Sequence, residues 1–154
     1  MLGKIESIKE VFDVGISPTR NTLDGNLGFS QMVKALSGYY VMDGFEVKTT
    51  KHTYYVLIDN EQSCCESWGT ISSEDNLKKF IGADLLEVNL TDKALNKQKV
   101  KESNYYCDEG GIQFVDFVTT EGVLQLAVYN AHNGYYGHPI VVAKDDDILL
   151  DCVL

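Results

Sequence analysis

Hydrophobic and polar residues alternate along much of the chain with the two-residue period of strands that bury one face. The clearest case is Leu86, Val88 and Leu90, which are separated by Glu87 and Asn89. Other stretches are dense in β-branched and aromatic residues, which are typical of strands. These stretches are 39–42, 45–48, 53–58, 112–119, 123–129, 139–143 and 148–153. The pattern therefore predicts a protein built mainly from β-strands.

Short turn-forming segments between these stretches predict antiparallel neighbours. Asp43-Gly44 is a dipeptide typical of hairpin turns, and Asn133-Gly134 is a stronger signal because both of its residues tolerate a positive φ. Residues 49–52 and 120–122 are predicted to form further turns. Antiparallel strands joined by such short connections form a meander, so we expect sequence neighbours to pair.

Residues 72–82 carry the strongest helical pattern of the chain. A serine stands at the start, acidic residues follow in the first turn and lysines in the last, as capping and the helix dipole favour. Leu77, Phe80 and Ile81 give this segment one apolar face. The pattern predicts a helix here.

Four other segments complete the chain. A second short helix is predicted at 30–38, where Ser30 provides a cap and Gly38 a stop. Residues 91–103 are polar and lysine-rich, which predicts a surface helix or a mobile connection. The spacing at 2–12 is compatible with a helix or a strand. Residues 16–28 have no period and are predicted to be a long loop or insertion.

The length of 154 residues and the mass of 17.2 kDa correspond to one domain, here 1–154. No internal repeat or linker divides it. We therefore expect a single compact α+β domain, with a mostly antiparallel sheet of about seven strands and two or three short helices.

Composition indicates a globular protein of the cytoplasm. Hydrophobic residues make up 44% and charged residues 23%, which are ordinary values. No stretch reaches the ~18 apolar residues of a membrane helix. Lys4 and Glu6 stand where a secretory signal would have its apolar run. The four cysteines, Cys64, Cys65, Cys107 and Cys152, are accordingly expected to be free thiols.

The balance of charge limits the partners that the chain can bind. Thirteen basic and 23 acidic residues give a net charge of −10, and Arg20 is the only arginine. Nucleic acids and anionic membranes are bound through lysine and arginine, so both are disfavoured as partners. A negative surface serves solubility, or it serves association with a partner protein that has a basic surface.

The first motif that could carry chemistry is Gln62–Gly69, directly after the most apolar strand. An exposed Cys64 or Cys65 thiol becomes nucleophilic only where a cation or imidazole stabilises the thiolate, and Glu66 has the opposite effect. The structural alternative is that both cysteines are small core hydrophobes and that Trp68 plugs the core.

The second motif, His132–His138, holds more aromatic and imidazole side chains than a turn requires. Tyr135 and Tyr136 on a glycine-supported loop give rigid contact area with polar tips, which suits recognition of a ligand or protein. The alternative is a plain hairpin whose tyrosines cover the sheet edge and whose histidines bond to the backbone.

The two motifs together resemble a small uncharacterised family of bacteriophages and mobile elements. The matching stretches are Cys64-Cys65-Glu66-Ser67-Trp68-Gly69, Phe80-Ile81-Gly82-Ala83 and His132-Asn133-Gly134-Tyr135-Tyr136-Gly137-His138. The resemblance covers about the second half of the chain, and 15–38 looks like an insertion of this protein. It implies no catalytic role for any residue. It does imply an accessory protein that acts on host machinery.

The first functional hypothesis is an acidic cytoplasmic binding protein that occupies or inhibits a host protein, such as a nucleic-acid-handling defence enzyme with a basic groove. No cofactor is expected. Its contact residues are predicted to come from the two motifs: Glu66, Trp68, His132, Asn133, Tyr135, Tyr136 and His138.

The alternative is a site for a small ligand or for hydrolysis, built from the same residues. A nucleotide-like base would stack on Trp68, Tyr135 and Tyr136. In the hydrolytic version Cys64 or Cys65 is the nucleophile, His132 or His138 the base, and Asn133 the orienting group.

No metal is expected. The cysteines and histidines lack the spacing of a compact zinc site, and Asp145-Asp146-Asp147 lacks the alternating ligands of a calcium loop. A charged turn is the prediction for 145–147.

Overall fold

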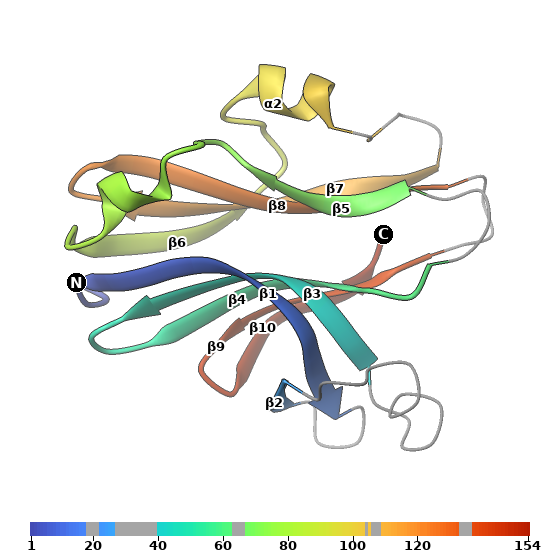
Figure 1. Cartoon of the computed structure of the whole chain (residues 1–154), viewed down its shortest axis with the longest axis horizontal. Helices are drawn as coiled ribbons and strands as arrows, with labels where there is room; N and C mark the ends of the chain where they lie inside the picture. Colours follow the sequence, from blue (N-terminus) through green and yellow to red (C-terminus); the bar gives the residue numbers. More distant parts are fainter. Residues whose placement is uncertain (18–21, 27–39, 63–66, 104, 106–108, 133–136) are drawn as a thin grey trace.

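The architecture is a two-layer β-sandwich, seen in the computed structural model of Figure 1. The structure describes residues 1–17, 22–26, 40–62, 67–103, 105, 109–132 and 137–154. Ten strands lie in this part of the chain: β1 (Ile5–Ser17), β2 (Thr22–Asn26), β3 (Tyr40–Thr49), β4 (Thr53–Asp59), β5 (Ser67–Ser72), β6 (Leu85–Thr91), β7 (Glu109–Thr119), β8 (Gly122–His132), β9 (Pro139–Lys144) and β10 (Asp147–Val153). Two short helical segments accompany them, η1 (Leu77–Phe80) and α2 (Lys97–Glu102).

The strands form two antiparallel sheets that face each other. One has six strands in the order β10-β9-β4-β3-β1-β2, and the other has four in the order β5-β8-β7-β6. Their inner faces bury a shared cluster that includes Phe45, Val56, Phe117, Leu126 and Ile140. Burial of this apolar surface between the sheets is the main stabilising contribution.

Apolar side chains are also buried on the outer faces of both sheets. Phe114 and Tyr129 pack with Val100 of α2, which lies over the four-stranded sheet in Figure 1. On the six-stranded sheet, Met42 and Leu57 are buried in a separate cluster. A strand buried on both faces has no polar alternation, which explains the continuous apolar run in β4.

The mostly antiparallel character is confirmed, but the α+β prediction with two or three helices is wrong. The part of the chain that the structure describes is an all-β sandwich, and its helical segments are a four-residue 3₁₀ turn and a six-residue helix. The extra strands come from 5–17, where helix and strand were both compatible, and from 22–26 and 67–72. The helix predicted at 30–38 lies outside the described residues.

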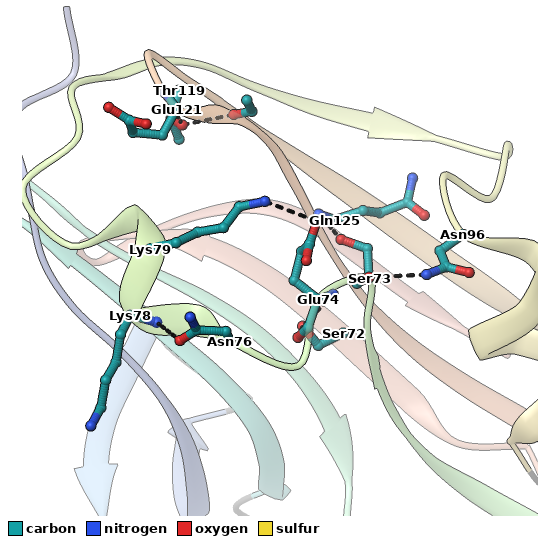
Figure 2. Close-up of polar contacts among 11 residues, drawn as sticks. Ser72, Ser73, Glu74, Asn76, Lys78, Lys79, Asn96, Thr119, Glu121 and Gln125 are labelled. Atoms are coloured by element: carbon teal, nitrogen blue, oxygen red, sulfur yellow. Dashed lines mark hydrogen bonds and ion pairs between the residues drawn. The ribbon is translucent and has the colours of Figure 1, made fainter.

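Contacts with the sheets explain why 72–82 forms only a 3₁₀ turn. The Ser73 hydroxyl accepts a hydrogen bond from the Gln125 amide (3.0 Å), and the Ser73 amide donates to the Gln125 carbonyl (2.9 Å). Figure 2 shows this attachment. At the other end the Gly82 amide donates to the Ile5 carbonyl (2.8 Å). Both ends are thus fixed to strands, and these tertiary contacts outweigh the local helical propensity of the segment.

Two segments that were expected to turn or loop contain strands instead. Residues 16–28 include the end of β1 and all of β2. β3 runs without interruption through Asp43 and Gly44, so the hairpin predicted there is wrong. The turn predictions at 49–52 and 120–122 are confirmed, because β3 pairs with β4 and β7 pairs with β8 across them.

Gly44 explains the failure of the Asp43-Gly44 signal. A Cβ atom at Gly44 would lie 1.9 Å from the carbonyl oxygen of Val56 on the neighbouring strand. The glycine is therefore required for close strand approach. Asp43 accepts hydrogen bonds from the Asp13 amide (3.0 Å) and the Asn60 side chain (2.9 Å) at a bulge in β1. Gly44 and Asp43 therefore both have structural roles within the sheet.

Among the described residues, none of the helices has the length and apolar character needed to span a membrane.

Candidate functional site

The two sequence motifs lie between strands that are neighbours in the two sheets. The first lies between β4 and β5, and the second between β8 and β9. β4 and β9 are neighbours in the six-stranded sheet, while β5 and β8 are neighbours in the other. The chain therefore passes from one sheet to the other between β4 and β5 and again between β8 and β9. The hairpin predicted around Asn133-Gly134 is wrong, because β8 and β9 belong to different sheets.

The described flanks of the two motifs touch through Trp68 and His138. Their ring centroids lie 5.6 Å apart, with the ring planes inclined at 30°. Trp68 projects from β5 against the shared core, and His138 precedes β9 and is 3% exposed. Sequence reasoning left open whether the motifs meet, and the structure brings them together at these two side chains.

Asp59 at the end of β4 holds the His138 ring. The Nδ1 atom of His138 lies 2.7 Å from the carbonyl oxygen of Asp59. A carbonyl only accepts, so Nδ1 carries the proton and donates. The Asp59 carboxylate Oδ2 is 3.9 Å from the same nitrogen, and the two side chains are 6% and 3% exposed. This buried carboxylate–imidazole pair fixes the tautomer and orientation of the ring.

The main chain of His138 is hydrogen-bonded as well as its ring. Its amide donates to the main-chain oxygen of Leu154 (3.0 Å), and the Leu154 amide donates back to its carbonyl (2.9 Å). The buried Asn130 side chain of β8 donates to the same Leu154 oxygen (3.1 Å). A Cβ at Gly137 would lie 2.7 Å from Val153 Cγ1, so a larger residue here would require the Val153 side chain to shift. β8, β9 and β10 are thereby joined at one point.

The indole nitrogen of Trp68 is a buried donor in this region. Its Nε1 atom is buried, and no acceptor in the described part of the chain reaches it. An unsatisfied buried donor costs about 1–3 kcal/mol. A ligand or partner that supplied an acceptor here would recover that cost.

The structure describes only part of the predicted site. Cys64, Cys65, Glu66, Cys107, Asn133, Tyr135 and Tyr136 lie outside the described residues. The main chain of His132 ends β8 opposite Glu109, and its side chain is likewise outside the description. The roles predicted for these residues therefore stay predictions.

Cys152, the one cysteine within the described residues, is a core residue rather than a nucleophile. It lies on β10, and its side chain packs against the shared core. Burial raises the pKa of the Cys152 thiol, and the nearby Asp151 carboxylate raises it further. A thiol in such surroundings stays protonated and inert at neutral pH.

Comparison with known proteins gives one match. Residues 4–142 match the model of a domain of unknown function, DUF7448. The chain belongs to the DUF7448 family. The match covers both motifs of this DUF7448 protein, and the family is uncharacterised, as the resemblance implied. The comparisons with curated proteins and with solved structures gave no match.

Asp59 and Asn130 are the residues of the DUF7448 site that sequence reasoning missed. Both carry a signal in hindsight, because each is a polar residue within or at the end of an apolar strand. Asn130 follows the Leu124–Tyr129 run and is fully buried. Buried polar residues need partners, so each such position predicts a specific contact. Within the described residues no group of three or more His, Cys, Asp or Glu could hold a metal ion.

Proposed function

We propose that this DUF7448 protein is a non-enzymatic binding protein that attaches to a basic surface of a partner protein in the cytoplasm. The resemblance to phage and mobile-element proteins makes a host protein the proposed partner, which the bound chain inhibits by occupying a groove that binds nucleic acid. An acidic surface speeds such an association by electrostatic steering.

The observation that carries the proposal is the charge of the β9–β10 hairpin. Asp145, Asp146, Asp147 and Asp151 are all exposed, and Lys144 is the only basic residue in 139–153. Several lysines elsewhere are paired with acids, for example Lys4 with Asp84 (2.8 Å) and Lys79 with Glu74 (3.1 Å). Acidic charge is therefore concentrated on this hairpin.

The geometry of the motif end supports binding over hydrolysis. His138 is buried and donates through Nδ1 to a carbonyl, so it acts as a positioning residue. It holds the start of β9 and the C-terminal strand in register. The half-buried Trp68 beside it has surface to offer a partner.

Affinity capture followed by binding measurements tests the proposal. The purified chain is used as bait in lysate of the source cells, and each captured protein is then purified and its Kd measured at 50 and 300 mM NaCl. We expect a partner with a basic surface and at least tenfold weaker binding at the higher salt, because salt screens exposed charges. If the partners are acidic, or if Kd is indifferent to salt, the proposal is wrong.

A second candidate function, binding of a nucleotide-like ligand, is favoured by the buried Trp68 Nε1 and its contact with the His138 ring. Trp68 is the only tryptophan, so its fluorescence reports on this site alone. Titration with nucleoside mono- and diphosphates should change the emission if the site takes a base. An unchanged emission across the series would exclude this candidate.

A further inference from the structure

The β10 strand has one open edge. It is the outermost strand of the six-stranded sheet and pairs, within the described residues, with β9 alone. An edge strand presents a row of main-chain amide and carbonyl groups to which another strand can bond. Seven residues, Asp147–Val153, are of ordinary strand length, so a partner strand has a full ladder to form.

Acidic and apolar side chains alternate on the exposed positions of this edge. Asp147 and Asp151 are exposed. Leu149, which lies between them, is 48% exposed, and Val153, which follows them, is 65% exposed. Neither aspartate makes an ion pair with another described residue. The edge thus offers carboxylates for basic side chains and apolar surface for the residues between them.

The other sheet edges fit a basic strand less well. On β6, Leu86 and Leu90 are also exposed. However, the start of β6 is already hydrogen-bonded to the N-terminal segment, and the adjacent Asp84 forms an ion pair with Lys4. β5 is short and uncharged, with the sequence Ser67-Trp68-Gly69-Thr70-Ile71-Ser72. The side chains of β2 lie outside the description.

A second copy of the chain is a poor occupant of the β10 edge. Two such edges side by side would bring aspartates of both copies together, and like charges on paired strands are destabilising. An extended segment rich in lysine or arginine has the opposite electrostatic effect.

We propose that β10 is the docking strand of this protein, on which an extended basic segment of the partner adds as a seventh strand to the six-stranded sheet. Asp147 and Asp151 are four residues apart, which is about 13 Å along a strand. The segment would therefore carry basic residues at that spacing, with apolar residues against Leu149 and Val153. This inference rests on the proposed function and names the mode of binding.

The test uses a defined probe, an eight-residue peptide with lysine at positions 1 and 5, valine at positions 3 and 7 and threonine elsewhere, so that lysines and valines alternate along one face of the strand. A second peptide of the same sequence carries N-methyl groups on alternate amides, which keeps the charge and removes ladder donors. We expect binding at 50 mM NaCl, protection of β10 amides from hydrogen exchange, and at least tenfold weaker binding of the methylated peptide.

Paired variants locate the site. D147N/D151N should weaken peptide binding at least tenfold, whereas E87Q/D92N on and after β6 should change it less than twofold. Equal binding of both peptides, protection of β6 in place of β10, or no effect of D147N/D151N would overturn the proposal. If the captured partner still binds D147N/D151N in a salt-dependent way, the proposed function stands and the β10 mode is wrong.

Discussion

Single residues determine how closely the strands of this protein approach. Gly44 and Gly137 stand where an added Cβ would lie 1.9 Å and 2.7 Å from a neighbouring strand or its side chain. His138 bonds to two separate segments, to Asp59 through its ring and to Leu154 through its amide and carbonyl. Local propensity indicates none of these roles, because each partner is far away in sequence.

Gly44→Ala should strongly destabilise the fold. The new methyl group overlaps the Val56 carbonyl, and either β3 or β4 must shift, at a cost of about 2–3 kcal/mol or more. Urea unfolding measures the change. Gly111→Ala is the matched control, since its Cβ would lie 3.4 Å from Leu154 Cδ2, and we expect a change below about 1 kcal/mol. Equal effects of the two variants would contradict this explanation.

His138→Leu should destabilise the protein by about 1–3 kcal/mol, because the Asp59 carbonyl loses its buried donor. The Trp68 emission should shift as well, since the rings are in contact. Thermal and urea unfolding together with fluorescence spectra measure both effects. His52→Leu, which removes the partly exposed pair with Asp145, is expected to cost less than about 1 kcal/mol and to leave the emission unchanged.

Asp145 provides a pH-dependent contribution at the β9–β10 turn. The Thr53 amide (2.8 Å) and, to a lesser extent, the His52 ring (2.8 Å) bond to its carboxylate and lower its pKa. Because the folded pKa is below the unfolded value, the contribution is present above about pH 4 and is lost as the pH falls through the folded pKa. The carboxylate is half exposed, so the effect stays under about 1 kcal/mol.

Comparison of Asp145→Asn with Asp146→Asn isolates this contribution. Unfolding free energies at pH 7 and pH 3 should show a loss for Asp145→Asn at pH 7 that shrinks at pH 3. Asp146→Asn removes the same formal charge next to it and should show a smaller loss. A loss for Asp145→Asn that grew at pH 3 would refute the assignment.

At the scale of elements, side-chain hydrogen bonds attach the irregular segments to the sheets. The buried Gln125 side chain of β8 donates to the Lys93 carbonyl (2.9 Å) and to Asp116 (2.8 Å), and it accepts from the Leu95 amide (2.8 Å). The Asn96 side chain donates to the Ser73 carbonyl (3.1 Å), as Figure 2 shows. These bonds hold the segment between β6 and α2 over the four-stranded sheet.

Gln125→Met should therefore loosen that segment. The substitution conserves volume but removes three hydrogen bonds, at a cost of about 2–3 kcal/mol. Hydrogen exchange at residues 92–96 should accelerate more than exchange in β7. Gln98→Met, which removes an exposed contact with Glu102 in α2, is the control and should have little effect on either measurement. A uniform acceleration over the whole chain would indicate global destabilisation instead.

At the scale of the whole molecule, the charge of −10 opposes the folded state through self-repulsion. Raising NaCl from 50 to 300 mM shortens the Debye length from roughly 14 Å to about 6 Å and should raise Tm by about 1–4 °C. Thermal unfolding followed by circular dichroism measures the shift. A Tm that falls with salt would mean that attractive ion pairs outweigh the repulsion.

The sequence by itself determined most of the strands, some of the turns between sequence neighbours and the surplus of acid. These properties are local: the strand that contains Leu86, Val88 and Leu90 and the turn at 120–122 need only nearby residues, although Leu86 and Leu90 are exposed and do not form a buried face. Tertiary structure decided the rest. Residues 72–82 form only one 3₁₀ turn, and Asp43-Gly44 lies within β3. The strands before and after Asn133-Gly134 belong to different sheets. The physical reason is that contacts between distant strands outweigh differences of local propensity, which are about 1 kcal/mol or less per residue. The meeting of Trp68, His138 and Asp59 has the same origin, because it depends on which strands are neighbours in each sheet.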